Sequence, residues 1–323
     1  MTLRFAAFLV LALQLAAGQG APAPAGGGPF APRPIVAGGV VIPLYRADSP
    51  FLKKDRLAEP EVDTMQASVP GRIQSIVNIH NPSIEIHPVD KGINTGALVI
   101  LVPGGGHNTL NVGTEGADFV HFFYNYGVNT AILRNRLRKD GYEVDVDAVR
   151  DAQQAIRVAR EHAAEFGVDP RKIGIVGFSA GAELAAAAAI RYERADARPD
   201  FVGLVYPGPS PFTRDAKTPV PADAPPTFIA CAGSGDAQHA IWADDYFRAF
   251  LSARVPNLEM HIYGNGVHAN GMKDRNGEPF GTWHERFVDW FRDLGFLQKP
   301  GVETKAARDV AAYVAGKQAP GKS

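Results

Sequence analysis

The hydrophobic residues of the chain form two alternating patterns. Short apolar runs rich in β-branched side chains cover 97–102, 130–133, 173–178, 201–206, 227–231 and 258–263. Runs of this kind are typical of strands buried on both faces of a sheet. Longer segments with a helical pattern lie between them, over 115–126, 146–166, 240–253 and 281–294. The alternation predicts an α/β fold, with a mostly parallel sheet and helices on both faces.

The pattern is weaker at the two ends of this region. Residues 73–79 and 83–87 predict two antiparallel strands, interrupted at Asn81-Pro82. Residues 40–72 carry scattered prolines and charges with little periodicity. One further helix is expected over 303–315, before a polar tail.

The N-terminus has the pattern of a targeting segment. Arg4 precedes an apolar run over 5–17, and small residues follow at 18–20. The run is too short for a membrane span, so residues 1–20 are predicted to be a signal peptide, with an uncleaved anchor as the alternative. The mature protein is then expected in the periplasm or outside the cell, with no membrane association.

Composition divides the rest of the chain. Residues 21–39 are rich in Pro, Ala and Gly and are predicted to be a flexible leader. A single folded domain is expected over 40–300, followed by a C-terminal helix and tail over 301–323. About 300 residues suffice for one large domain that buries roughly three quarters of its unfolded surface.

Charge and cysteine content exclude some functions. The chain has 33 basic and 34 acidic residues and no basic stripe, so nucleic acid is not an expected partner. Cys231 is the single cysteine, which rules out an internal disulfide, and its place at the end of an apolar run predicts a buried thiol. Cysteine and histidine show no ligand spacing, so neither a metal nor a cofactor is predicted.

A Gly-x-Ser-x-Gly sequence at 177–181 joins the run 173–178 to an alanine-rich helical segment. The chain must turn within one or two residues, and Gly177 and Gly181 permit this because a side chain there would collide with neighbouring elements. Ser179 is left exposed at the N-terminus of a helix. This strand–turn–helix pattern predicts a nucleophile elbow.

Polar loops follow three other predicted strands. In sheets of this class, functional loops leave the carboxyl ends of the strands. One loop contains Asp236, the next contains His268, and their order after Ser179 is that of a Ser–Asp–His triad. The imidazole would take the serine proton, and the carboxylate would fix its tautomer. Asp244 and Asp245 remain alternatives for the acid, and His107 is the nearby alternative for the base.

The third loop is Pro-Gly-Gly-Gly at 103–106. Its glycines permit backbone N–H groups to point at a developing oxyanion. We expect the N–H of Ala180 and that of Gly105 or Gly106 to form the oxyanion hole. His107, Asn108 and Trp242 are predicted to contact substrate.

Several motifs resemble one family. They are Asn81-Pro82-Ser83, the glycine loop, 134–137 (RNRL), 151–157 (DAQQAIR), 169–174 (DPRKIG) and 177–181 (GFSAG). From about residue 42 to 297 the chain resembles the α/β-hydrolase superfamily, and within it secreted acetyl xylan esterases and bifunctional acetyl xylan/feruloyl esterases. It departs from that pattern at His107, often aromatic in the family, and at Val267, where the family usually has glycine.

The resemblance implies a serine carboxylic ester hydrolase that acts on acetyl or feruloyl esters, with plant polysaccharide as the expected substrate. Residues 207–226 are short and proline-rich, so a large lid is not expected and short acyl chains should be preferred. Trp242, Tyr246 and Trp283 could supply aromatic surface, although core packing is an equal alternative for Trp283. The alternative functions are those of a generic carboxylesterase or lipase-like enzyme, a peptidase-like hydrolase, and a non-catalytic binding module. A monomer or small homo-oligomer is expected.

Overall fold

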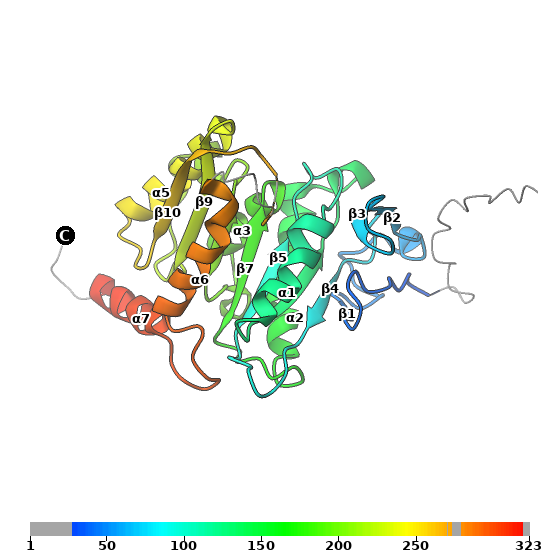
Figure 1. The fold of residues 1–323 in the computed structure, drawn as a ribbon, viewed down its shortest axis with the longest axis horizontal. Coiled ribbons are helices and arrows are strands. Elements are labelled where there is room, and N and C mark those ends of the chain that lie inside the picture. Colours follow the sequence, from blue (N-terminus) through cyan, green and yellow to red (C-terminus); the bar gives the residue numbers. More distant parts are fainter. Residues whose placement is uncertain (1–27, 270, 273–278, 319–323) are drawn as a thin grey trace, which may run out of the picture.

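The computed structural model describes residues 28–269, 271–272 and 279–318. Its centre is an eight-stranded sheet with the order β1-β4-β6-β5-β7-β8-β9-β10 (Figure 1). The pairs β1/β4 and β4/β6 are antiparallel, and all the pairs from β6 to β10 are parallel. The strands are β1 (Val40–Pro43), β4 (Ser83–His87), β5 (Leu98–Val102), β6 (Asn129–Arg134), β7 (Ile173–Phe178), β8 (Val202–Val205), β9 (Thr227–Ser234) and β10 (Glu259–Asn265).

Helices alternate with the parallel strands, as the sequence pattern predicts. They are α1 (Asp118–Tyr124), α2 (Val149–Glu161), α3 (Ala180–Ile190), α4 (Pro211–Arg214), α5 (Ala237–Ser252), α6 (Trp283–Asp293) and α7 (Lys305–Gln318). Each of α1 and α2 is preceded by a π-helical turn, Gly113–Ala117 and Val144–Ala148 respectively. Short 3-10 turns lie at Lys54–Arg56, Arg138–Asp140, Ala195–Ala197 and Pro279–Thr282. No helix in the described part of the chain is long and apolar enough to cross a bilayer.

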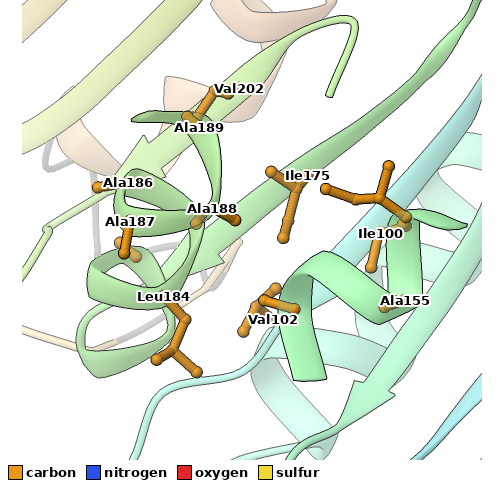
Figure 2. Packing of buried hydrophobic residues seen from close by; sticks show 14 of the residues in the cluster. Ile100, Val102, Ala155, Ile175, Leu184, Ala186, Ala187, Ala188, Ala189 and Val202 are labelled. Carbon is orange, nitrogen blue, oxygen red and sulfur yellow. The ribbon is translucent and has the colours of Figure 1, made fainter. Parts of the chain in front are cut away.

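The two faces of the sheet have different cores. On one face, α2, α3 and α5 pack on the strands, and the buried cluster there includes Ala186–Ala189 of α3; Figure 2 shows Ala188 facing Ile175 and Ala189 beside Val202. Alanine side chains leave room for the helix to lie close to the sheet, and a larger residue there would overpack the core. α1 and α6, in front of the sheet in Figure 1, cover the other face with aromatic rings such as Phe119 and Trp283.

The predicted antiparallel pairing of 73–79 with 83–87 is wrong. β3 (Ile73–Val77) pairs instead with β2 (Val62–Met65) in a separate two-stranded sheet, while β4 joins the central sheet. Asn78, which lies between β3 and β4, has a positive φ of 63°. β2 lies in the region where the sequence shows little periodicity.

Part of the predicted leader belongs to the folded domain. Phe30 and Ile35 are buried, and the backbone N–H groups of Ile35 and Val36 donate to the carboxylate of Glu85 at 2.6 and 2.9 Å. Residues 28–39 are therefore not part of a flexible leader, as was predicted for 21–39. The Pro-, Ala- and Gly-rich composition of the segment did not indicate that these apolar residues would be buried. The predicted signal peptide 1–20, leader residues 21–27 and tail residues 319–323 lie outside the described residues.

Candidate active site

The Gly-x-Ser-x-Gly turn has the strained geometry that a nucleophile elbow needs. Ser179 lies between β7 and α3 with φ 52° and ψ −120°, a conformation that L-residues rarely adopt. A Cβ on Gly177 would lie 2.3 Å from the carbonyl oxygen of Gly181, and one on Gly181 would lie 2.0 Å from that of Val102. The two glycines are thus required by close backbone contacts on both sides of the serine.

Ser179, His268 and Asp236 come together from three separate loops. The Ser179 hydroxyl lies 2.8 Å from Nε2 of His268, and Nδ1 of His268 lies 2.9 Å from Oδ2 of Asp236. The carboxylate accepts from Nδ1–H, which selects the tautomer whose Nε2 can take the serine proton. This is the hydrogen-bond order of a nucleophile, a base and an orienting acid.

The alternative residues lie elsewhere. Asp244 pairs with Arg248 at 3.5 Å on an exposed part of α5. His107 is buried, and its Nε2 is 3.4 Å from the Oε2 of Glu183. The structure thus brings Asp236 and His268, rather than Asp244 or His107, to the serine.

The glycine loop lies directly against the elbow. A Cβ on Gly104 would meet the carbonyl oxygen of Phe178 at 2.6 Å and Cβ of Ser179 at 2.8 Å. The carbonyl oxygens of Gly104 and Gly105 turn inward and accept from the N–H groups of Asn111 and Asn108, at 2.9 and 3.1 Å respectively.

That turn determines where the next N–H groups point. In a trans peptide the C=O of one residue is antiparallel to the N–H of the next. The N–H groups of Gly105 and Gly106 therefore point away from the inside of the loop. Ala180 is the first residue of α3, where N–H groups have no partner within the helix.

The predicted substrate contacts are only partly in suitable places. Asn108 is exposed beside the glycine loop, and Trp242 is partly exposed on α5. His107 is buried and lies next to Glu183, so it is not in a suitable place to contact substrate. Tyr246 and Trp283 are 0% and 1% exposed, so the prediction that Tyr246 adds aromatic surface to the rim is wrong, and core packing, the alternative for Trp283, is confirmed. Trp283 packs in the core and donates from Nε1 to the carbonyl oxygen of Gly271 at 2.9 Å.

A buried carboxyl group that the sequence analysis did not identify supports the glycine loop. Glu115 accepts from the N–H of Gly104 at 2.7 Å and from the hydroxyl of Tyr206 at 2.8 Å. Burial raises the pKa of Glu115 to about 7, against the opposing effect of these hydrogen bonds. The Tyr206 hydroxyl also accepts from the N–H of Gly271 at 3.1 Å, and its ring packs edge-on against His268. Glu115 and Tyr206 thus connect the glycine loop to the segment that carries the histidine.

A second histidine was also missed. Nδ1 of His239 lies 2.6 Å from Oδ1 of Asp236, and its ring stacks on His268 with centroids 3.7 Å apart and planes 21° apart. Burial and then the positive charge of His268 lower the pKa of His239, against the raising effect of Asp236. The signal was in the sequence, because a residue three positions after Asp236 falls on the same side of the first helical turn.

Asp236, His239 and His268 also form the group of described residues that could hold a metal ion, with ligand atoms within 4.8 Å of one another. The spacing in sequence did not predict this group. Hydrogen bonds between its members account for its compactness, since each imidazole presents Nδ1 to one carboxylate oxygen.

Comparison with known proteins bears on the fold. Residues 146–228 match a family whose description is the α/β hydrolase fold. The chain is 30% identical over 115 residues to an acetylxylan esterase of Xylanibacter ruminicola, a match over 35% of this chain and 23% of that protein. It is 30% identical over 127 residues to endo-1,4-beta-xylanase B of Butyrivibrio fibrisolvens, over 34% of this chain and 19% of that one. The matches thus span less than a quarter of either relative.

Solved structures give the same fold over most of the chain. An acetyl ester-xyloside bifunctional hydrolase from Caldicellulosiruptor lactoaceticus superposes with a TM-score of 0.62 at 22% identity, over 80% of this chain and 97% of that one. Thermogutta terrifontis esterase 2 phosphorylated by paraoxon gives 0.60 at 19% identity, over 80% and 95%. The predicted α/β-hydrolase fold is confirmed, as is the resemblance to acetyl xylan esterases.

Proposed function

We propose that this protein is a serine hydrolase of carboxylic esters. The observation that carries the proposal is the chain of hydrogen bonds from Ser179 through His268 to Asp236, at the tip of a strained elbow and beside a glycine loop. The esterase names among the structural neighbours support the same conclusion.

The geometry accounts for each step of ester hydrolysis. His268 takes the proton of Ser179 as the oxygen attacks the ester carbonyl, and Asp236 stabilises the imidazolium that forms. The N–H groups of Ala180 and of Gly105 or Gly106 stabilise the tetrahedral oxyanion. His268 then protonates the departing alcohol. Water, activated by the same histidine, releases the acid from the acyl-enzyme.

For the substrate we propose short acyl esters. The preferred candidates are acetyl or feruloyl esters of plant polysaccharide. The relatives named as an acetylxylan esterase and a xylanase support this class. The short connection between β8 and β9 supports a preference for short acyl chains, since residues 207–226 contain only the four-residue helix α4 and no large lid. Arg214 of α4 forms ion pairs with Asp145 and Glu183, and these ion pairs hold residues 207–226 next to α3. Export of the mature protein, as the pattern over 1–20 predicts, fits a polymeric substrate.

Paraoxon provides the direct test of the nucleophile. A serine hydrolase should release one equivalent of p-nitrophenol in a burst, and mass spectrometry should place the phosphoryl adduct on Ser179. Ser179→Ala should remain folded, give no burst and lose on the order of 10⁶ in kcat on p-nitrophenyl acetate. Residual activity above about a tenth of wild type would contradict a Ser179 nucleophile.

A substrate panel tests the class of ester. It contains p-nitrophenyl esters of increasing chain length, acetylated xylan and methyl ferulate. Acetate release from xylan with a preference for short chains is the expected result. Activity on simple esters alone would favour the generic carboxylesterase, and interfacial activation on long chains would favour a lipase.

A further inference from the structure

The acid of the triad holds two imidazoles rather than one. Oδ2 of Asp236 accepts from Nδ1 of His268 at 2.9 Å, and Oδ1 accepts from Nδ1 of His239 at 2.6 Å. The Asp236 side chain is 6% exposed, so little water reaches it. His239 is therefore the principal partner of the oxygen that His268 does not use.

His239 is itself fixed by packing. Its ring lies flat on His268, with 3.7 Å between centroids, and Trp242 meets it edge-on at 5.0 Å. On another side of His268, Tyr206 packs edge-on at 5.0 Å. The two imidazoles are thus held between aromatic side chains of α5 and of the segment after β8, and neither can turn without disturbing the other.

We propose that His239 is a positioning residue for the triad, which holds the Asp236 carboxylate in the orientation that His268 needs and divides the charge of that carboxylate between two imidazoles. The inference rests on the proposed serine esterase function. It extends the site from three residues to four, with the fourth acting through the acid.

Two consequences follow for the reaction. Without the N–H of His239, Oδ1 loses a charge-assisted hydrogen bond and the carboxylate can rotate away from His268. An undivided carboxylate would also hold the proton on His268 more tightly, so the base would become neutral only at higher pH.

His239 must stay neutral for this arrangement to work. His268 becomes positive during acylation, and a second positive ring at 3.7 Å would oppose that charge. Burial and the charge of His268 hold the pKa of His239 below its usual range, while Asp236 and Glu183 act in the opposite direction. Glu183 is already paired with Arg214 at 3.0 Å.

Charged and titratable groups reach the two rings from each neighbouring element. They are Asp236 at the start of α5, Glu183 of α3 and Tyr206 after β8, and His107 lies beyond Glu183 at 3.4 Å. The variants described below leave all of these groups in place, so a change in the pH profile reports on position 239.

The test compares two substitutions of His239. His239→Phe keeps an aromatic ring for stacking and removes the N–H donor. His239→Asn places an amide N–H near the position of Nδ1 and cannot become charged. His121→Phe is the control for removal of a histidine, since His121 is exposed on α1.

The measurements are kcat, KM and the pH profile of kcat/KM on p-nitrophenyl acetate. For His239→Phe we expect kcat to fall about ten- to a hundredfold, the value of one hydrogen bond to a charged group, with KM little changed. The midpoint of its acid limb should move to higher pH, by on the order of half a unit to one unit. His239→Asn should restore most of kcat and keep the wild-type midpoint, and His121→Phe should match the wild type.

Several results would overturn the inference. Unchanged kcat and an unchanged acid limb in His239→Phe would show that the second imidazole is not needed. Equal losses in the Phe and Asn variants without a shift of the acid limb would indicate a purely structural role. If His239→Phe does not fold, His239→Leu removes the same donor from a smaller side chain and decides the question.

Failure of the proposed function would look different. In that case the wild type would give no paraoxon burst at Ser179. A normal burst with unaltered pH profiles in the His239 variants would reject the positioning role alone.

Discussion

Gly105→Ala should disable the glycine loop while the triad stays in place. Gly105 has φ 131°, and a Cβ built there lies 2.2 Å from the carbonyl oxygen of Thr109. Contacts below 3.0 Å are essentially never seen for real Cβ atoms, so the two backbones must separate by about 0.8 Å. The atom in the way is backbone rather than the end of a flexible side chain, so the loop itself has to move.

The displacement is large enough to cost most of the activity. The N–H of Gly105 or Gly106 is expected to face the oxyanion, and a shift of about 1 Å in a reacting group costs on the order of 10² in rate. Loss of one oxyanion-hole donor costs about 10²–10³ in kcat. We therefore expect kcat of Gly105→Ala to fall at least about a hundredfold, with KM little changed. The strained backbone should also lower the free energy of unfolding by about 1–3 kcal/mol.

Gly106→Ala provides the matched control. Gly106 has φ 64°, and a Cβ there meets only the side-chain amide of Asn108 at 3.6 Å, an ordinary contact. Alanine in this left-handed conformation costs about 1–2 kcal/mol of stability without a steric collision.

The assay is steady-state kinetics on p-nitrophenyl acetate, with paraoxon titration to count functional Ser179 and urea unfolding to measure stability. The expected order of kcat is wild type, then Gly106→Ala, then Gly105→Ala. A folded Gly105→Ala enzyme with kcat within about tenfold of wild type would refute the argument, because the loop would then tolerate the shift or contribute no donor.

Three further predictions follow from the site. His268→Ala should abolish hydrolysis of p-nitrophenyl acetate, whereas His107→Ala should retain activity, and the reverse result would reject His268 as the base. A chelator should leave hydrolysis unchanged. Excess Zn²⁺ should inhibit hydrolysis, because it would bind to Asp236, His239 and His268. Activity that is lost with chelator and restored by zinc would overturn the serine mechanism. Burial raises the pKa of Glu115 to about 7, above its unfolded value near 4.5, so its contribution to stability is present below pH 4.5 and is lost as pH rises through 7. Urea midpoints at pH 5 and 8 should therefore differ less in Glu115→Gln than in the wild type, and an equal or larger difference in the variant would refute this role.

The sequence predicted those parts of the fold that depend on local pattern. Strands such as β5 and β7 are buried on both faces and read as continuous apolar runs, and the elbow is specified by two glycines around Ser179. The pairing of β3 with β2 could not be predicted in this way, because the choice of a strand partner depends on tertiary contacts.

The candidate active site likewise contains residues that the sequence predicts and residues that it does not. Ser179, Asp236 and His268 each follow a strand, and that rule was enough to select them. Glu115 and Tyr206 lie 91 residues apart and meet only in the folded chain, so no local signal revealed them. His239 differs from both, since its position three residues after Asp236 made it predictable once helix α5 was assigned.

The buried thiol of Cys231 makes chemical labelling selective. It is the chain's single cysteine, it is 0% exposed within β9, and burial raises its pKa to about 12. A thiol reagent in neutral solution should therefore leave the native protein unmodified and react only when β9 separates from its neighbours. Because β9 leads to Asp236, the rate of labelling would report the opening of the strand that carries the acid. A cysteine engineered on the exposed side of α7 would, for the same reason, be the single fast-reacting handle for a fluorophore or a solid support.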